Sequence, residues 1–186
     1  MMDSFTTRKA SMRQRSRLRF GRDLMAGLTL VSVLSLCGCG LTIPSDPSGT
    51  LDAVRGGVLR AGVSPNAPFV DVTGVDEEPT GTEPTGTEVE AIEAFADHLD
   101  ADVEWTIGSE EELVRDLEDG ELDLVAGGLT DETPWSDKAG VTRAYDEVTD
   151  DDGRVQKLVM LAPMGENAFI SELETFLSRY SREHSS

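Results

Sequence analysis

The sequence predicts an α/β fold, a three-layer, doubly wound, mainly parallel sheet within a single domain. Short apolar stretches of strand length alternate with longer stretches whose apolar residues repeat at helical spacing. Strands that alternate with helices predict parallel pairing through right-handed crossovers. The 148 residues after position 38 suit one domain with a sizeable core.

Residues 1–38 are predicted to be a signal peptide. Seven basic residues precede an apolar run of 13 residues at positions 24–36, which is typical of a secretory signal. The run is shorter than the roughly 20 residues that a spanning helix needs. Residues 36–39 read Leu-Cys-Gly-Cys, and a lipoprotein signal peptidase would cleave before Cys39. We therefore expect Cys39 to carry acyl chains such as palmitate, because two chains give stable anchoring in the bilayer.

Two alternatives remain open for this segment. The apolar run could be an uncleaved anchor helix, or Cys37 and Cys39 could form a redox pair. A redox pair would be expected in a C-x-x-C turn inside a folded domain. The lipoprotein interpretation places the domain on the extracytoplasmic face of the cell membrane.

The charge divides at the predicted cleavage site. Residues 1–38 hold 7 basic and 2 acidic residues, so the remainder holds 9 basic and 34 acidic residues. Such a negative domain excludes nucleic acid as a partner, because phosphates would be repelled. The acidity indicates either a well-solvated surface in a salty or high-GC organism or a specific acidic function.

The chain after Cys39 begins with a predicted flexible tether at 39–54, rich in Gly, Thr, Pro, Ser and Asp. The predicted lobe spans residues 55–180. Its first strand covers 58–63 and is broken by two prolines in 64–69. A polar loop follows, in which 78–82 and 83–87 repeat the pentapeptide Glu-Pro-Thr-Gly-Thr.

A helix is predicted from Glu88, because apolar residues up to Leu99 share one face. Residues 103–107 form a short predicted strand. Ser109 and Glu112 form a capping box that opens the next helix, and Gly120 ends it. A strand is then predicted at 122–126, and it ends at two glycines.

The last part of the chain is predicted to contain a strand from 155 to 162 and a helix that opens at 166–167. Residues 181–186 are predicted to be a disordered tail. Residues 150–153 resemble a calcium loop, but an EF-hand count from Gly153 puts valines at positions one and twelve. We therefore expect a solvated turn there.

The order of these segments resembles that of the bacterial extracellular solute-binding proteins of family 3, the receptors of polar amino-acid ABC transporters. The most specific stretch, 117–128, is similar to the family's L-x-x-G-x-x-D-hydrophobic-G signature. Three other stretches are similar to the family. Residues 57–69 resemble its opening strand with the Pro-Phe turn, residues 86–92 resemble its glycine before an acidic helix start, and residues 141–145 resemble its strand ending in Tyr. The resemblance implies one lobe of a type II periplasmic-binding-protein fold.

The chain departs from this family in two respects. A complete member inserts a second lobe after the strand ending in Tyr, where this chain has only residues 146–153 before a segment that resembles the return to lobe one. Members that bind amino acids place an Arg after the Gly-rich strand end, where it pairs with the ligand carboxylate. Residues 129–135 contain no Arg and two acids.

A candidate binding edge lies beyond the carboxyl ends of the first and third strands, where open α/β sheets bind ligands. The backbone N–H groups of Gly127, Gly128 and Leu129, the Thr130 hydroxyl and the Phe69 ring are expected to face a ligand or a protein partner there. The alternative is that the glycines only permit a tight turn and that Phe69 fills the core. Trp135 is either a recognition anchor or a lid over the sheet.

No catalytic set, metal site or cofactor motif is predicted, and His98 and His184 are expected to be surface residues. The main hypothesis is a transport-associated binding or accessory lipoprotein, with a membrane transporter or permease as partner and a small polar solute, such as a cation or amine, as ligand. The alternative is an envelope lipoprotein with a structural or interaction role and no ligand. The resemblance also implies a third candidate, a dehydratase-like enzyme, but this chain lacks the closed cleft and basic groups that such an enzyme needs.

Overall fold

The computed structural model describes residues 46–73, 83–150 and 152–184. The predicted signal peptide, Cys39, the first part of the tether and the first copy of the pentapeptide lie outside these residues. No helix within the described ranges is long and apolar enough to cross a membrane.

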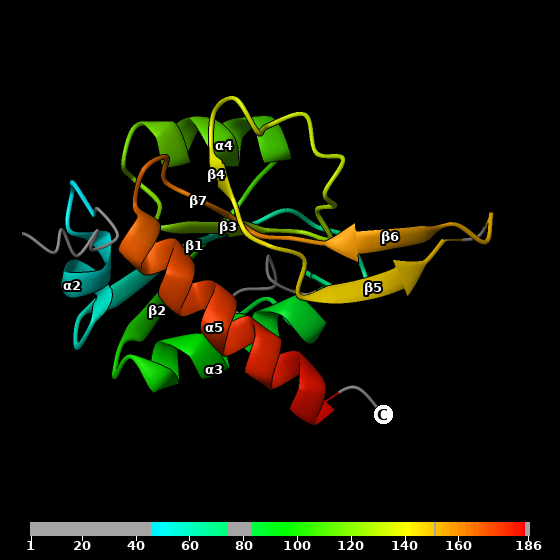
Figure 1. Ribbon diagram of the computed structural model, residues 1–186, viewed down its shortest axis with the longest axis horizontal. Coiled ribbons are helices and arrows are strands. Elements are labelled where there is room, and N and C mark those ends of the chain that lie inside the picture. The colour runs from blue at the N-terminus through cyan, green and yellow to red at the C-terminus, as the bar shows by residue number, and fades with distance from the viewer. Residues whose placement is uncertain (1–45, 74–82, 151, 185–186) are drawn as a thin grey trace, which may run out of the picture. The chain divides into compact units, whose positions relative to one another are not determined.

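A five-stranded sheet forms the centre of the fold, in the order β2-β1-β3-β7-β4 (Figure 1). The strand β1 pairs in parallel with β2 on one side and with β3 on the other. The strand β7 pairs antiparallel with both β3 and β4. The strands span Val58–Val63 (β1), Asp102–Ile107 (β2), Leu124–Ala126 (β3), Gly140–Val141 (β4) and Leu161–Ala162 (β7).

Helices cover both faces of this sheet, which confirms the predicted three-layer α/β fold. The helices α3 (Thr87–His98) and α5 (Asn167–His184) pack on one face, where Phe95 and Phe169 meet edge to face at 5.8 Å. The helix α4 (Glu110–Glu118) covers the other face with a separate apolar cluster. Ser109 and Glu112 form the predicted capping box, and Gly120 follows the helix with a positive φ.

The prediction of one continuous strand at 155–162 is wrong. The strand β6 (Val155–Leu158) pairs with β5 (Asp146–Thr149) in a separate two-stranded hairpin, and only Leu161–Ala162 joins the main sheet as β7. The chain changes partner between them, because Val159 N–H bonds to the Leu129 carbonyl and Met160 N–H bonds to the Thr142 hydroxyl. The hairpin stands where the family resemblance implies a second lobe, and Gly153 lies in its turn.

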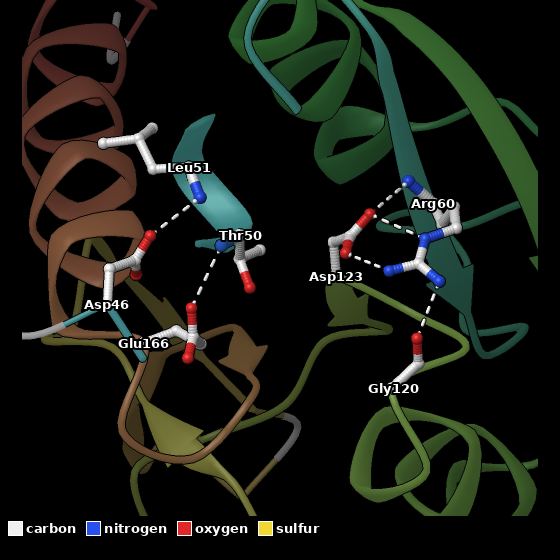
Figure 2. A network of polar contacts seen from close by, with 7 residues as sticks. All are labelled: Asp46, Thr50, Leu51, Arg60, Gly120, Asp123 and Glu166. Carbon is white, nitrogen blue, oxygen red and sulfur yellow. Dashed lines mark hydrogen bonds and ion pairs between the residues drawn. The ribbon is translucent and has the colours of Figure 1, made fainter. Parts of the chain in front are cut away.

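Residues 46–54, which were predicted to belong to the tether, are part of the folded unit. The short helix α2 (Thr50–Val54) buries Val54 in the core. Glu166 accepts the N–H groups of Ser48 and Thr50 at 2.8 and 3.1 Å, and Asp46 accepts those of Leu51 and Phe169 at 3.0 and 3.3 Å. Figure 2 shows the bonds to Thr50 and Leu51. The starts of α2 and α5 therefore cap each other.

The other end of the domain also differs from the prediction. The helix α5 continues to His184, so residues 181–184 are helical and not a disordered tail.

The strand β3 begins at Leu124, two residues later than predicted. Asp123, just before it, is buried and pairs with Arg60 of β1 through two nitrogens, while Arg60 also donates to the Gly120 carbonyl (Figure 2).

Candidate functional site

A buried carboxylate lies at the carboxyl end of the parallel strands. Glu88, in the first turn of α3, is 1% exposed. Its Oε2 atom accepts the N–H groups of Gly127 and Gly128, both at 2.8 Å, and its Oε1 atom accepts the hydroxyl of Tyr145. Three segments that are far apart in the sequence are therefore joined at one side chain.

Burial dominates the electrostatics of this group. Burial raises the pKa of Glu88, and the hydrogen bonds from Tyr145, Gly128 and Gly127 oppose that rise only in part. Burial also raises the pKa of Tyr145, and the nearby charge of Glu88 adds to this effect. Tyr145 therefore stays a neutral donor to the carboxylate.

The backbone N–H groups at the predicted binding edge have a different partner from the one expected. The N–H groups of Gly127 and Gly128 were expected to face a ligand, but both are bound to Glu88. Gly128 has φ +66, and a Cβ there would lie 2.5 Å from Cδ2 of Phe69 and from Nδ2 of Asn66. The glycine is therefore needed both for its backbone conformation and for the close approach of the Phe69 ring.

The remaining predicted residues do not gather at one point. Leu129 is buried in the cluster beneath α4, and Thr130 forms a bridge with Leu158 of the hairpin. Trp135 is half-buried against that same cluster and donates from Nε1 to Glu110 at 3.0 Å. Phe69 packs with the cluster on the opposite face of the sheet. A ligand role for these residues stays a prediction.

A cavity of about 490 Å³ lies next to Glu88, and apart from Phe69 none of its lining residues is among the predicted site residues. We call it the Glu88 cavity. One wall is the start of α3, with Glu88, Glu90 and Ala91, and a second is the Pro68–Phe69 turn. The other walls come from the residue before the hairpin, the hairpin itself and the end of α5, namely Tyr145, Asp146, Val148, Leu158, Tyr180, Ser181 and His184.

Aromatic side chains form much of one wall. Tyr180 and His184 stack with their ring centroids 4.0 Å apart, and Phe176 lies 5.8 Å from Tyr180 along the same helix. Burial, together with the charges of Glu90 and Glu93, raises the pKa of Tyr180. His184 is exposed, as predicted for a surface histidine, but it also borders the cavity.

Little in the sequence could have revealed this cavity. The glycine and acidic residue at 86–88 mark Glu88 as the first acid of a helix, which is a common and unspecific position. Tyr180 and His184 lie at helical spacing, but the other walls of the cavity come from separate segments at 68–69, 87–91 and 145–158. Within the described ranges, no three His, Cys, Asp or Glu side chains are grouped as a metal site would require.

Comparison with known proteins identifies the family. The model of the bacterial extracellular solute-binding proteins, family 3, matches residues 59–179. The chain belongs to this family. Family 3 proteins are extracellular solute-binding proteins, so the solute-binding class that the sequence resemblance implied is confirmed. No curated protein matches this chain.

Solved structures of the family 3 type confirm one lobe of the periplasmic-binding-protein fold. The arginine-bound domain 1 of TmArgBP from T. maritima is 18% identical, with a TM-score of 0.56 over 69% of this chain and 97% of that one. An arginine-specific periplasmic binding protein of Salmonella typhimurium is 11% identical, with a TM-score of 0.56 over 69% and 95%. An ancestral cyclohexadienyl dehydratase is 13% identical, with a TM-score of 0.60 over 77% and 94%.

Proposed function

We propose that this family 3 protein is a lipid-anchored, extracytoplasmic binding subunit that holds a small solute in the Glu88 cavity of a single lobe. The observation that carries the proposal is the cavity itself, because about 490 Å³ is within the range of small-molecule sites. Its described walls all come from one lobe, so a solute held there contacts several walls without a second lobe. A membrane transporter or permease is the proposed partner.

The arginine-bound structure of domain 1 of TmArgBP supports this arrangement, because that single domain was seen with a ligand. In the present chain, the wall residue Tyr145 and the floor residue Glu88 are fixed by their mutual hydrogen bond. A site whose walls are fixed before binding loses less freedom when its ligand arrives. This preorganisation substitutes for the closing of a two-lobe clamp.

A screen of the full-length protein in mild detergent tests the binding role. Isothermal calorimetry or thermal shift against polar metabolites should reveal a solute, and a ligand at 100 times its Kd should add about 2.7 kcal/mol of stability. The variant Val148→Trp fills the cavity and should abolish binding. Val155→Trp is the matched control, because Val155 is 61% exposed on the neighbouring strand and does not line the cavity.

Flat melting curves across the whole panel would contradict the solute-binding role. They would favour the alternative of an envelope lipoprotein with a structural or interaction role.

The lipid anchor has a separate test. We propose that Cys39 is acylated and that the signal peptide ends before it, because residues 36–39 carry the lipoprotein cleavage pattern. Labelling of cells with an alkyne analogue of palmitate should mark the wild type and Cys37→Ser, and should leave Cys39→Ser unlabelled. Label retained in Cys39→Ser would contradict the assignment of the anchor to this residue.

We also propose that the protein is not an enzyme. The most buried carboxylate of the site, Glu88, already accepts three hydrogen bonds, so it is held as a structural acceptor and is not free to shuttle a proton. Incubation with prephenate-like substrates should give no product above the uncatalysed rate. Turnover that is lost in Val148→Trp would establish the dehydratase-like alternative instead.

A further inference from the structure

We propose that the solute of the Glu88 cavity is an organic cation without a carboxylate group, such as an alkyl or aryl amine or a guanidinium compound. This inference rests on the proposed function, because it names the class of solute that the same cavity takes. It separates the protein from receptors for whole amino acids, which must hold a carboxylate as well as an amine.

The first argument is the sign of the charges that border the cavity. Glu90 on α3 and Asp146 on β5 are both exposed carboxylates on different walls, and Glu88 lies beneath them. Among the described residues that line the cavity there is no Lys or Arg, and His184 is the one side chain of this group that is able to carry a positive charge. A cation that enters therefore meets opposite charge from two sides, while an anion meets like charge.

The second argument concerns the donors that a carboxylate would need. The backbone N–H groups nearest to Glu88, those of Gly127 and Gly128, are both occupied by its Oε2 atom. The hydroxyl of Tyr145 is occupied by its Oε1 atom. The internal carboxylate of Glu88 thus occupies these three donors, and a ligand carboxylate at this end of the cavity would lie beside Glu88 without them.

The third argument is the aromatic and apolar part of the wall. The side chains of Phe69 and Tyr180 line the same cavity as the two exposed acids, and Tyr180 is held in a stack with His184. Aromatic faces attract cations, and the attraction increases when the cation leaves water. The side chains of Ala91, Val148 and Leu158 provide apolar surface for the carbon skeleton of an amine.

The decisive experiment compares pairs of compounds that differ only in the carboxylate. Agmatine with arginine, cadaverine with lysine, and tyramine with tyrosine are titrated by calorimetry into the full-length protein in mild detergent. We expect at least one amine to bind, and its amino acid to bind at least tenfold more weakly. Equal or tighter binding of the amino acid would overturn this inference and leave the solute-binding role intact.

Two other outcomes separate the inference from the proposed function. Binding of an anionic or neutral solute in the same cavity, abolished by Val148→Trp, would sustain the function and overturn the cation assignment. Absence of binding by every compound in the pairs and in the wider panel would overturn both.

Substitutions identify the groups that select the cation. Glu90→Gln and Asp146→Asn should each weaken amine binding by about threefold to tenfold, since each removes one charge at a partly solvated site. Asp97→Asn is the matched control, because Asp97 is an exposed acid on the same helix that does not line the cavity. An equal loss in all three variants would point to the general charge of the protein and not to this cavity. Melting temperatures that match the wild type show that each variant is folded.

Discussion

The hydroxyl of Tyr145 donates a hydrogen bond to Oε1 of Glu88, whose Oε2 accepts two backbone N–H groups from the end of β3. This contact ties the segment before the hairpin to the start of α3. It fixes the floor and one wall of the Glu88 cavity at the same time. The stability of the lobe and the shape of its cavity therefore depend on the same carboxylate.

Removal of this carboxylate should destabilise the fold strongly. Glu88→Ala leaves buried donors without acceptors, and we expect a loss of about 3 kcal/mol or more in the free energy of unfolding. Glu88→Gln keeps a carbonyl oxygen for the glycine N–H groups, and we expect it to stay within about 1 kcal/mol of the wild type. Urea unfolding followed by circular dichroism measures both values, and similar losses for the two variants would contradict the role of the acceptor.

The pH dependence of stability should also reveal Glu88. Because burial raises its pKa in the folded state, the folded protein binds this proton at a higher pH than the unfolded chain does. The stabilisation from this proton is fully present below the unfolded pKa of about 4.3 and is lost as the pH rises through the folded pKa. The free energy of unfolding of Glu88→Gln minus that of the wild type should therefore increase with pH across this window and then level off.

The variant must be compared with the wild type, because other carboxylates change the free energy of unfolding with pH in the opposite direction. The pKa of Glu112, for example, is lowered by its hydrogen bond with the Ser109 hydroxyl. Such groups cancel in the comparison. A difference that stays constant from pH 3 to pH 8 would show that Glu88 titrates normally.

Gly128 should be much less tolerant of a side chain than Gly153. Both have positive φ values, +66 and +79, so Ala at either position should cost about 1 to 2 kcal/mol for the backbone conformation. A Cβ at Gly153 meets nothing within 4 Å, while one at Gly128 meets the Phe69 ring at 2.5 Å. We expect Gly128→Ala to lose at least 1 kcal/mol more than Gly153→Ala, as measured by thermal unfolding. Equal losses would show that the ring moves away freely.

The reciprocal capping of α2 and α5 should hold the N-terminal segment on the domain. Glu166→Ala removes the acceptor for the N–H groups of Ser48 and Thr50, and should cost about 1 to 2 kcal/mol. Hydrogen exchange of those two amides should become faster. The control is Glu183→Ala, an exposed acid at the other end of α5. Unchanged exchange in Glu166→Ala would mean that α2 stays docked through Val54 alone.

The elements that the sequence predicted correctly are those with local signals. The apolar spacing from Val89 to Leu99 predicted α3, and the Ser109 and Glu112 pair predicted the start of α4. The strand β1 and the order of alternating elements followed in the same way. Apolar periodicity and capping depend on residues a few positions apart, so they can be identified without any knowledge of the fold.

The sequence by itself determined the fold class, the family and the acidic character of the lobe. Only the tertiary structure decided that residues 155–162 divide between two sheets, that Glu166 caps a helix 116 residues earlier, and that Glu88 takes the two amides expected to face a ligand. The physical reason is that a backbone donor binds the acceptor that packing brings nearest to it. That acceptor is set by strand pairing and helix docking between distant segments, for which a short stretch of sequence carries no signal.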